Sequence, residues 1–301
     1  MIKSQFTLKQ LEAFVCVVDI GTFRKAATLL GTTQPNISAR ISALEERLGI
    51  LLLHRDAGSV RLTEKGKVLL VSARQILWAS EAFLETAARQ DLIAERLRLG
   101  VTELVACSWL HVFLRRFREA YPSVVVELQV DLSVEIDRGL SEGQLDLALQ
   151  TGPFQHETSA SLPLGRYPYA WVAAPDLARR VGRRPDMATM LGSSVLTHAR
   201  HGLASRELAA FVSAKGLAGD RIVHSSSLSS CIQMAEDGMG IALLPELLVR
   251  GAAQDGRLEW IDCGWLPSPL ELCARFDQTR APRFVRAAAD CAIETAKAEA
   301  H

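Results

Sequence analysis

The sequence has no excess of charge of either sign, because its 301 residues include 34 lysines and arginines and 34 aspartates and glutamates. A balanced chain has no overall field that would draw it to nucleic acid or to a membrane surface. It also lacks a long apolar run near its start, where Glu12 and Asp19 interrupt the most apolar stretch. We therefore expect no signal peptide, no membrane-spanning helix and a cytoplasmic location.

Motifs of enzymes and cofactor sites are also missing. The chain has no G-x-S-x-G elbow, no Walker loop and no H-E-x-x-H pair. Gly238-Met239-Gly240 lacks the third glycine of a dinucleotide loop, and a helix-to-strand turn explains it better. His198, His201 and Ser205 could be read as hydrolytic, but a polar ligand-facing loop is the simpler interpretation. We expect no catalytic residue and no cofactor.

The six cysteines are scattered, and none lies in a C-x-x-C pair or at metal-ligand spacing from a histidine. We therefore expect no metal site. Reduced core thiols are the simpler interpretation, and a redox-sensing pair is the alternative.

What the sequence does contain is a complete helix from Gln34 to Leu48. Thr33 is placed to cap its first amides, Pro35 suits its first turn, and Gly49 suits the left-handed residue that ends it. Four apolar residues recur at helical spacing and predict a buried stripe: Ile37, Ile41, Leu44 and Leu48. The polar side chains on the other faces belong to Gln34, Asn36, Ser38 and Arg40. A buried stripe, small outer residues and donors near the amino end are typical of a helix that reads the DNA major groove.

Two further helices precede this one, over about residues 8–18 and 23–30, and Thr22 can cap the second. After Gly49, the segments 50–54 and 60–62 flank a turn and predict a small hairpin, or wing. We expect Arg55, in this wing, to contact the DNA backbone or minor groove. The pattern is that of a winged helix-turn-helix.

These residues resemble the amino-terminal domain of LysR-type transcriptional regulators. The matching positions are Phe14, Gly21-Thr22-Phe23, Ala26-Ala27, Leu30, Gln34-Pro35, Ser38, Ile41, Leu44-Glu45, Leu48-Gly49, Leu52, Arg55 and Leu62-Thr63-Glu64-Lys65-Gly66. The chain departs at Leu53, where the family usually has Phe, and at Ala39, where many members have Arg. The resemblance implies a DNA-binding regulator that forms homodimers or tetramers.

A long proline-free helix is predicted to begin after Thr63 and to run to about Gln90. Leu70, Leu77 and Leu84 repeat every seven residues, which favours a dimer seam. The alternative is a helix that packs only on its own domain.

From Arg96 onward, strands alternate with helices and predict an α/β domain with parallel strands and crossover helices. Two lobes joined by two crossings resemble a periplasmic-binding-protein-like effector domain. We expect a winged helix-turn-helix domain over 1–62, a linker helix over 63–92 and an effector domain over 93–301. Its first lobe should comprise about 93–162 and 268–301, and its second lobe about 163–267.

Polar residues that follow strands in both lobes predict an effector site in the cleft between them, because ligands bind at the carboxyl ends of strands in open sheets. These residues are Thr102, Ser133, Thr151, His198, His201, Gly202 and Ser226. Each Ser or Thr could also be only a helix cap. Hydroxyls, amides and imidazoles without a committed Arg or Lys suit a small organic anion.

The sequence therefore predicts a LysR-type regulator that binds double-stranded DNA under the control of a small effector. The alternatives are a cytoplasmic solute-binding protein or an enzyme with a fused DNA-binding domain.

Overall fold

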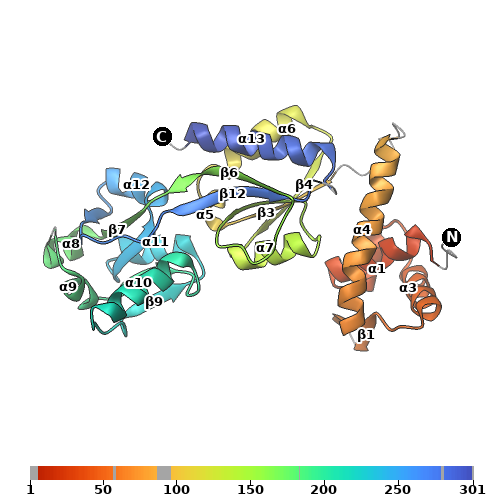
Figure 1. The fold of residues 1–301 in the computed structure, drawn as a ribbon, viewed down its shortest axis with the longest axis horizontal. Helices are drawn as coiled ribbons and strands as arrows, with labels where there is room; N and C mark the ends of the chain where they lie inside the picture. Colours follow the sequence, from red (N-terminus) through yellow and green to blue (C-terminus); the bar gives the residue numbers. More distant parts are fainter. Residues whose placement is uncertain (1–5, 57–58, 87–95, 183, 279–280, 300–301) are drawn as a thin grey trace. The chain divides into compact units, whose positions relative to one another are not determined.

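The computed structural model describes residues 6–56, 59–86, 96–182, 184–278 and 281–299. The chain forms two compact units. The N-terminal unit comprises residues 1–95 with 142–144 and 279–282, and the C-terminal unit comprises the remainder (Figure 1). In the described residues, no helix combines the length and apolar character needed to cross a bilayer.

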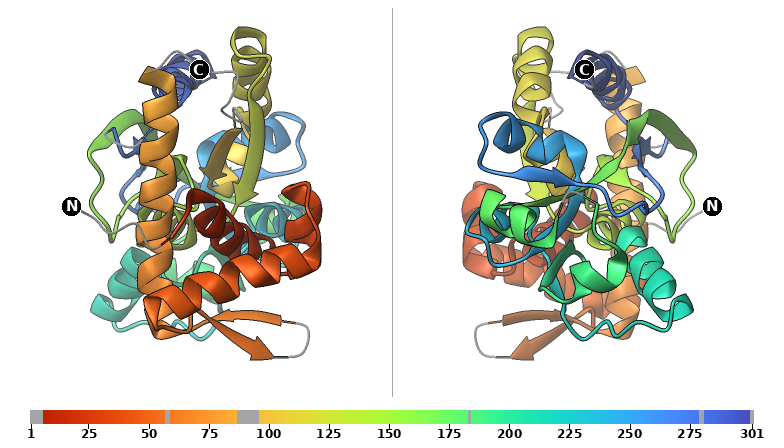
Figure 2. Two further views of the ribbon diagram at one scale, coloured as in Figure 1. Left: turned by 90° about the vertical axis from the view of Figure 1, so that its right-hand side faces the viewer. Right: turned by 90° about the vertical axis from the view of Figure 1, so that its left-hand side faces the viewer.

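The N-terminal unit is a helix-turn-helix followed by a hairpin and a long helix. Its elements are α1 Leu8–Ile20, α2 Phe23–Leu29, α3 Gln34–Leu48, β1 Leu53–Asp56, β2 Ser59–Leu62 and α4 Glu64–Thr86. Phe14 from α1, Ala26 from α2 and Ile37, Ile41 and Leu44 from α3 are buried in one core. The predicted helix-turn-helix, wing and apolar stripe are thus confirmed, and the part of the predicted linker helix beyond residue 86 lies outside the described residues. Figure 2 shows the wing strands extending away from the helices.

Two close contacts fix the wing against its neighbours. Glu45 on α3 is 6% exposed, and its carboxylate accepts hydrogen bonds from the backbone amides of Leu52 at 2.8 Å and Leu53 at 3.2 Å. On the other side, a Cβ atom on Gly66 would lie 2.2 Å from the carbonyl oxygen of Leu52, so only glycine fits in this first turn of α4. Thr63 caps the same turn by accepting from the Gly66 amide at 2.9 Å.

Two of the three leucines predicted to form a dimer seam on α4 instead pack against the core of their own domain. Leu70 is 3% exposed and lies in the core of its own domain, and Leu77 packs partly against that core. Leu84 is half-buried. The exposed apolar side chains of α4 are instead Val68, Ile76 and Phe83, with exposed fractions of 68%, 38% and 73%.

Helix geometry separates these two sets of residues. At roughly 100° per residue, Val68, Ile76 and Phe83 share one face of α4, and the seven-residue repeat of leucines projects from a distinct face. Leu70 and Leu77 are therefore corrected to core positions that pack within the chain.

The C-terminal unit begins with a lobe built on a five-stranded sheet of order β4-β3-β5-β12-β6. Its elements are β3 Arg96–Val101, α5 Glu103–Ala106, α6 Leu110–Ala120, β4 Val125–Val130, α7 Ser133–Ser141, β5 Leu147–Thr151, β6 Ala160–Tyr167, β12 Leu270–Phe276 and α13 Arg283–Glu299. Helices α6 and α13 cover one face of this sheet and α7 covers the other (Figure 1).

The second lobe is built on a sheet of order β11-β7-β10-β8-β9. Its elements are β7 Tyr169–Ala173, α8 Pro175–Val181, α9 Met187–Leu191, β8 Val195–His198, α10 Leu203–Ala214, β9 Ile222–Ser225, α11 Leu228–Glu236, β10 Ile241–Pro245, α12 Glu246–Gln254 and β11 Glu259–Ile261. The alternation predicted the α/β class correctly, but the pairings of β12, β6, β7 and β11 are antiparallel rather than parallel.

The chain crosses between the lobes twice. The first crossing lies at Pro168, later than the boundary near 163 expected from the sequence, because residues 160–167 pair with β12 as an extra strand of the first sheet. This strand contains Pro163 and Gly165, and its pairing shifts register between Leu272 and Cys273. Proline, glycine and a bulge make such a strand hard to recognise from its sequence. The second crossing leads from β11 to β12.

Candidate DNA-reading surface and effector site

The amino end of α3 presents the polar residues that the sequence singled out. Thr33 caps the helix by accepting from the Asn36 amide at 3.4 Å, and Gly49 ends it with a φ of 64°. The side chains of Thr33, Gln34, Pro35 and Asn36 are exposed, whereas Ser38 and Arg40 are half-buried.

These side chains differ in how they are already engaged. The side-chain Nδ2 of Asn36 donates to the Thr32 hydroxyl at 3.2 Å, so this side chain is already engaged within its own turn. Within the described part of the chain, the side chains of Gln34 and Arg40 show no hydrogen bond or ion pair. Arg55 lies in β1, but its side chain falls outside the described residues. Gln34 and Arg40 are thus the donors most available to a duplex.

In the first lobe, Thr102, Ser133 and Thr151 meet at the carboxyl end of the sheet. The Thr102 amide donates to the Leu149 carbonyl at 3.1 Å, and the Ser133 hydroxyl donates to the Thr151 carbonyl. Thr102 is 7% exposed, and its hydroxyl oxygen is buried with no hydrogen-bond partner among the described residues. The three residues that the sequence singled out in this lobe therefore lie together, and their role in effector binding stays a prediction.

A buried ion pair holds the segment that follows Thr151. Asp137 on α7 and Arg275 on β12 are paired, and both side chains are 3% exposed. Asp137 also accepts from the amides of Gln155 at 2.9 Å and His156 at 3.0 Å. The Arg275 guanidinium lies over the Phe154 ring at 3.9 Å. This network fixes the backbone just beyond the end of β5.

In the second lobe, His198 is the last residue of β8, and the other predicted residues lie on the loops after β8 and β9. His198 Nε2 is 3.2 Å from the carbonyl oxygen of Ser226. Gly202 begins α10 and donates its amide to the Ala199 carbonyl at 2.7 Å, while His201 is exposed. Burial lowers the pKa of His198, despite the opposing effects of Ser226 and Glu103, so its imidazole is neutral near pH 7.

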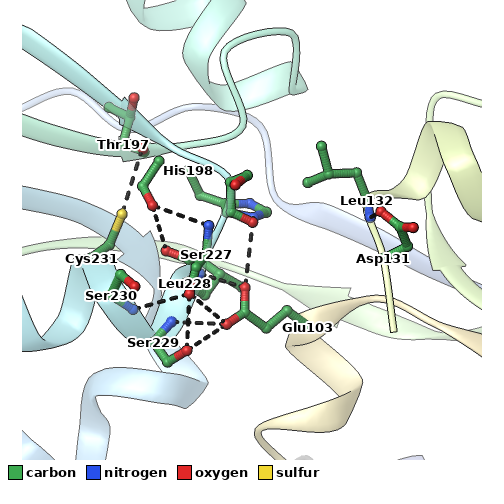
Figure 3. Close-up of polar contacts among 12 residues, drawn as sticks. Glu103, Asp131, Leu132, Thr197, His198, Ser227, Leu228, Ser229, Ser230 and Cys231 are labelled. Atoms are coloured by element: carbon green, nitrogen blue, oxygen red, sulfur yellow. Dashed lines mark hydrogen bonds and ion pairs between the residues drawn. The ribbon is translucent and has the colours of Figure 1, made fainter. Parts of the chain in front are cut away.

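The two lobes are joined by Glu103, a residue that sequence reasoning did not select. Glu103 follows Thr102 in the first lobe, and its carboxylate reaches the start of α11 in the second (Figure 3). It accepts from the Ser229 hydroxyl at 2.6 Å, the Ser229 amide at 3.1 Å, the Ser227 hydroxyl at 3.1 Å and the Leu228 amide. One of its oxygens is also 4.0 Å from His198 Nε2. We call this group of contacts the interlobe junction.

Hydrogen bonding determines the charge of Glu103. Burial alone would raise its pKa, but the hydrogen bonds from Ser229, Leu228 and Ser227 outweigh burial and leave the pKa below its usual value. The carboxylate is therefore ionised at the amino end of α11, where free amides and the helix dipole favour an anion. The available sequence signal was its position directly after a strand and Thr102.

A winged helix-turn-helix joined to a two-lobed α/β domain defines a DNA-binding regulator that carries its own small-molecule sensor. The family model described as "Bacterial regulatory helix-turn-helix protein, lysR family" matches residues 8–67, and the "LysR substrate binding domain" model matches residues 90–297. The chain therefore belongs to the LysR family of transcriptional regulators.

Individual relatives agree with this assignment. A probable hydrogen peroxide-inducible genes activator from Streptomyces viridosporus is 31% identical over 261 residues, which cover 85% of this chain and 83% of the relative. A full-length OxyR structure from Pseudomonas aeruginosa has a TM-score of 0.75 at 19% identity, covering 97% of this chain and 95% of that one. ArgP from Mycobacterium tuberculosis has a TM-score of 0.72 at 23% identity, covering 95% and 96%. At these identities the two structures support the fold alone.

Proposed function

We propose that this regulator reads its operator with α3 through Thr33, Gln34, Pro35, Asn36, Ser38 and Arg40, and that Arg55 in the wing contacts the backbone or minor groove. The reading domain would comprise residues 1–62, the linker helix 63–92 and the effector domain 93–301. The protein would act in the cytoplasm, where its DNA lies, and would catalyse no reaction.

One observation carries the proposal for α3: its exposed Gln34 and half-buried Arg40 lack partners among the described residues, while Ile37, Ile41 and Leu44 hold the helix on its own core. Glutamine can pair in a two-pronged manner with adenine, and arginine with guanine. Both donors are thus free to take base edges without first breaking a contact in the protein.

The test is the variant Gln34→Ala, compared on a selected operator duplex and on random duplex by gel retardation. We expect a loss of about 1 to 3 kcal/mol on the operator and little change on random DNA. Arg55→Ala serves as the comparison, because loss of a phosphate contact should weaken binding to both duplexes and flatten the salt dependence. An equal loss on both duplexes for Gln34→Ala would remove Gln34 from the base-reading set.

For the effector we propose a small organic anion bound at the interlobe junction, among Thr102, Ser133, Thr151, His198, His201, Gly202 and Ser226. The amides and hydroxyls at the start of α11 already hold one carboxylate, that of Glu103. The same donors would serve an effector carboxylate that displaces Glu103. The unpartnered hydroxyl of Thr102 would then receive a hydrogen bond from, or give one to, the same molecule.

We propose that dimers form through α4, and that the dimer seam consists of Val68, Ile76 and Phe83 rather than the leucines that repeat every seven residues. Large apolar side chains with exposed fractions of 68%, 38% and 73% on one helix face are costly to leave in water. A second copy of the chain is the occupant expected for this face, because a regulator with one reading helix per chain needs a two-fold to bind two half-sites.

Peroxide sensing by a thiol is the second candidate, because the relative from Streptomyces viridosporus is a probable hydrogen peroxide-inducible genes activator. The chemistry of the cysteines argues against it. Burial raises the pKa of Cys107, Cys231, Cys263 and Cys291, and Cys16 is buried in the core of the N-terminal unit. Peroxide reacts with thiolates, and raised pKa values keep these thiols protonated. We therefore favour a bound effector over thiol oxidation.

A further inference from the structure

The second lobe contains a pocket of about 450 Å³ that the interlobe junction does not use. Its lining includes Tyr169 and Trp171 from β7, Glu246 from the start of α12, Trp260 from β11, and Asp262 and Trp265 from the segment after β11. This volume lies within the usual range for small-molecule sites.

The pocket adjoins both crossings between the lobes. Tyr169 directly follows Pro168, the first crossing, and the Glu246 amide donates to the Pro168 carbonyl at 2.8 Å. Trp265 lies in the segment that leads from β11 to β12, the second crossing, and its carbonyl accepts from Trp171 Nε1 at 3.0 Å. A molecule in this pocket would therefore contact Tyr169, which directly follows the first crossing, and Trp265, which lies in the second.

The rings are held in place by contacts that do not block the pocket. Trp265 stacks on Phe211 with ring centroids 4.8 Å apart, and Trp171 is 1% exposed. At the mouth, Trp260 and Leu266 stay 45% and 51% exposed, which leaves large apolar surfaces in water. The accessible indoles of Trp260 and Trp265 beside an exposed apolar mouth favour a ligand that has an apolar body.

The charged residues that line the pocket are acidic. Glu246 and Asp262 are its charged lining residues, and no lysine or arginine lies among the described residues that line it. Burial, together with the charge of nearby Glu207, raises the pKa of Tyr169. Arg250 lies 3.3 Å from Glu246 and Arg184 lies 3.6 Å from Asp262, but both pairs are open to solvent, and such pairs contribute little. A cationic ligand could replace Arg184 beside Asp262 at small cost.

We propose that this hinge pocket is a second small-molecule site, separate from the interlobe junction, and that it binds an organic cation with an apolar body, such as a quaternary ammonium compound. Aromatic faces attract such cations through the ring quadrupole, and the two carboxylates add charge complementarity. Binding beside both crossings would favour one angle between the lobes, so the site would tune the effector response.

The test titrates the full chain with choline and with 3,3-dimethylbutan-1-ol, which has the same shape without the charge, using ligand-observed NMR. We expect saturable binding of choline and binding of the neutral alcohol that is weaker by about tenfold. Equal binding of the two compounds, or no saturable binding of choline, would overturn the proposal.

Two variants locate the site. Trp260→Ala and Glu246→Gln change side chains that reach solvent and should each weaken choline binding by about tenfold. Val223→Ala is the control, because Val223 is a comparably exposed residue, at 43%, on the edge strand at the other side of the same sheet. Unchanged choline binding in both Trp260→Ala and Glu246→Gln would contradict the proposal. Operator binding by the same variants is measured in a separate gel-retardation experiment, so that a failure of the pocket proposal can be told apart from a failure of the proposed DNA-binding function.

Discussion

Thr102 buries a hydroxyl oxygen that has no hydrogen-bond partner among the described residues. An unsatisfied buried polar group costs about 1 to 3 kcal/mol, whereas an apolar group of the same shape costs nothing comparable. Thr102→Val should therefore leave the free energy of unfolding of the ligand-free chain unchanged, or raise it by about 1 kcal/mol. If a bound effector supplies the missing partner, the same variant should lose the thermal stabilisation given by active metabolites.

Ser133→Ala is the companion variant in this thermal-shift screen. The Ser133 hydroxyl already donates a hydrogen bond to the Thr151 carbonyl, so removing this hydroxyl should lower the stability of the ligand-free chain. A metabolite response that survives in both variants would place the effector elsewhere.

The cysteines give a second prediction at the residue scale. Treatment of the chain with one equivalent of hydrogen peroxide should oxidise Cys107, Cys231, Cys263 and Cys291 no faster than free cysteine, because burial raises the pKa of each thiol. Mass spectrometry after thiol alkylation measures this directly. A disulfide or sulfenic acid that forms rapidly and changes operator binding would restore the peroxide-sensing alternative.

At the scale of single elements, α3 and α4 show what periodicity can predict. The spacing of Ile37, Ile41 and Leu44 identified the buried face of α3 correctly, because one apolar stripe leaves only one face to bury. In α4, apolar residues occupy two faces, and a seven-residue repeat cannot tell which one packs within the chain. Leu70 and Leu77 pack within it, and the exposed face carries Phe83.

The seam prediction follows from this difference. Phe83→Asp should convert dimers to monomers at low protein concentration, because it would bury an unpaired carboxylate at a cost of several kcal/mol. Sedimentation velocity provides the measurement. Leu51→Asp is a control, since Leu51 is also an exposed apolar residue, at 67%, but lies before the wing. A Phe83→Asp chain that stays fully dimeric would exclude this face as the seam.

The wing makes a further prediction at this scale. Gly66→Ala would place a Cβ atom 2.2 Å from the Leu52 carbonyl oxygen, so either the wing or the first turn of α4 must shift. We expect a loss of about 1 to 3 kcal/mol in the stability of the N-terminal unit, measured by thermal or urea unfolding. A neutral Gly66→Ala would mean that this contact is looser than the structure indicates.

At the scale of the whole molecule, Glu103 and α11 were hard to connect from the sequence. The alternation of short strands and helices predicts the α/β class. Thr102, Ser133 and Thr151 can be selected from the sequence because each lies at or just after the end of a strand. The partners of Glu103 lie 124 to 126 positions further along the chain, and no local pattern links them. Only the fold brings the first lobe to the start of α11.

The interlobe junction should depend on pH in one direction. The pKa of Glu103 is lowered in the folded chain, so its contribution is complete above the ordinary value of 4.5 and is lost as the pH falls through the lowered value. Glu103→Gln should imitate the acidic state at neutral pH, and the amides of Leu228 and Ser229 should then exchange their hydrogens faster. The same variant should bind an anionic effector more tightly, because the competing carboxylate is gone. Weaker binding would mean that Glu103 itself contacts the effector.

We propose that an effector bound at the interlobe junction changes the spacing of the two α3 helices of a dimer on DNA. The most direct measurement is a footprint of the full chain on its selected operator, with and without the metabolite that gives the largest thermal shift, for the wild type and Thr102→Val. We predict that the metabolite changes the length or spacing of the wild-type footprint and leaves the footprint of the variant as it is without metabolite. A metabolite that changes both footprints equally would contradict this account.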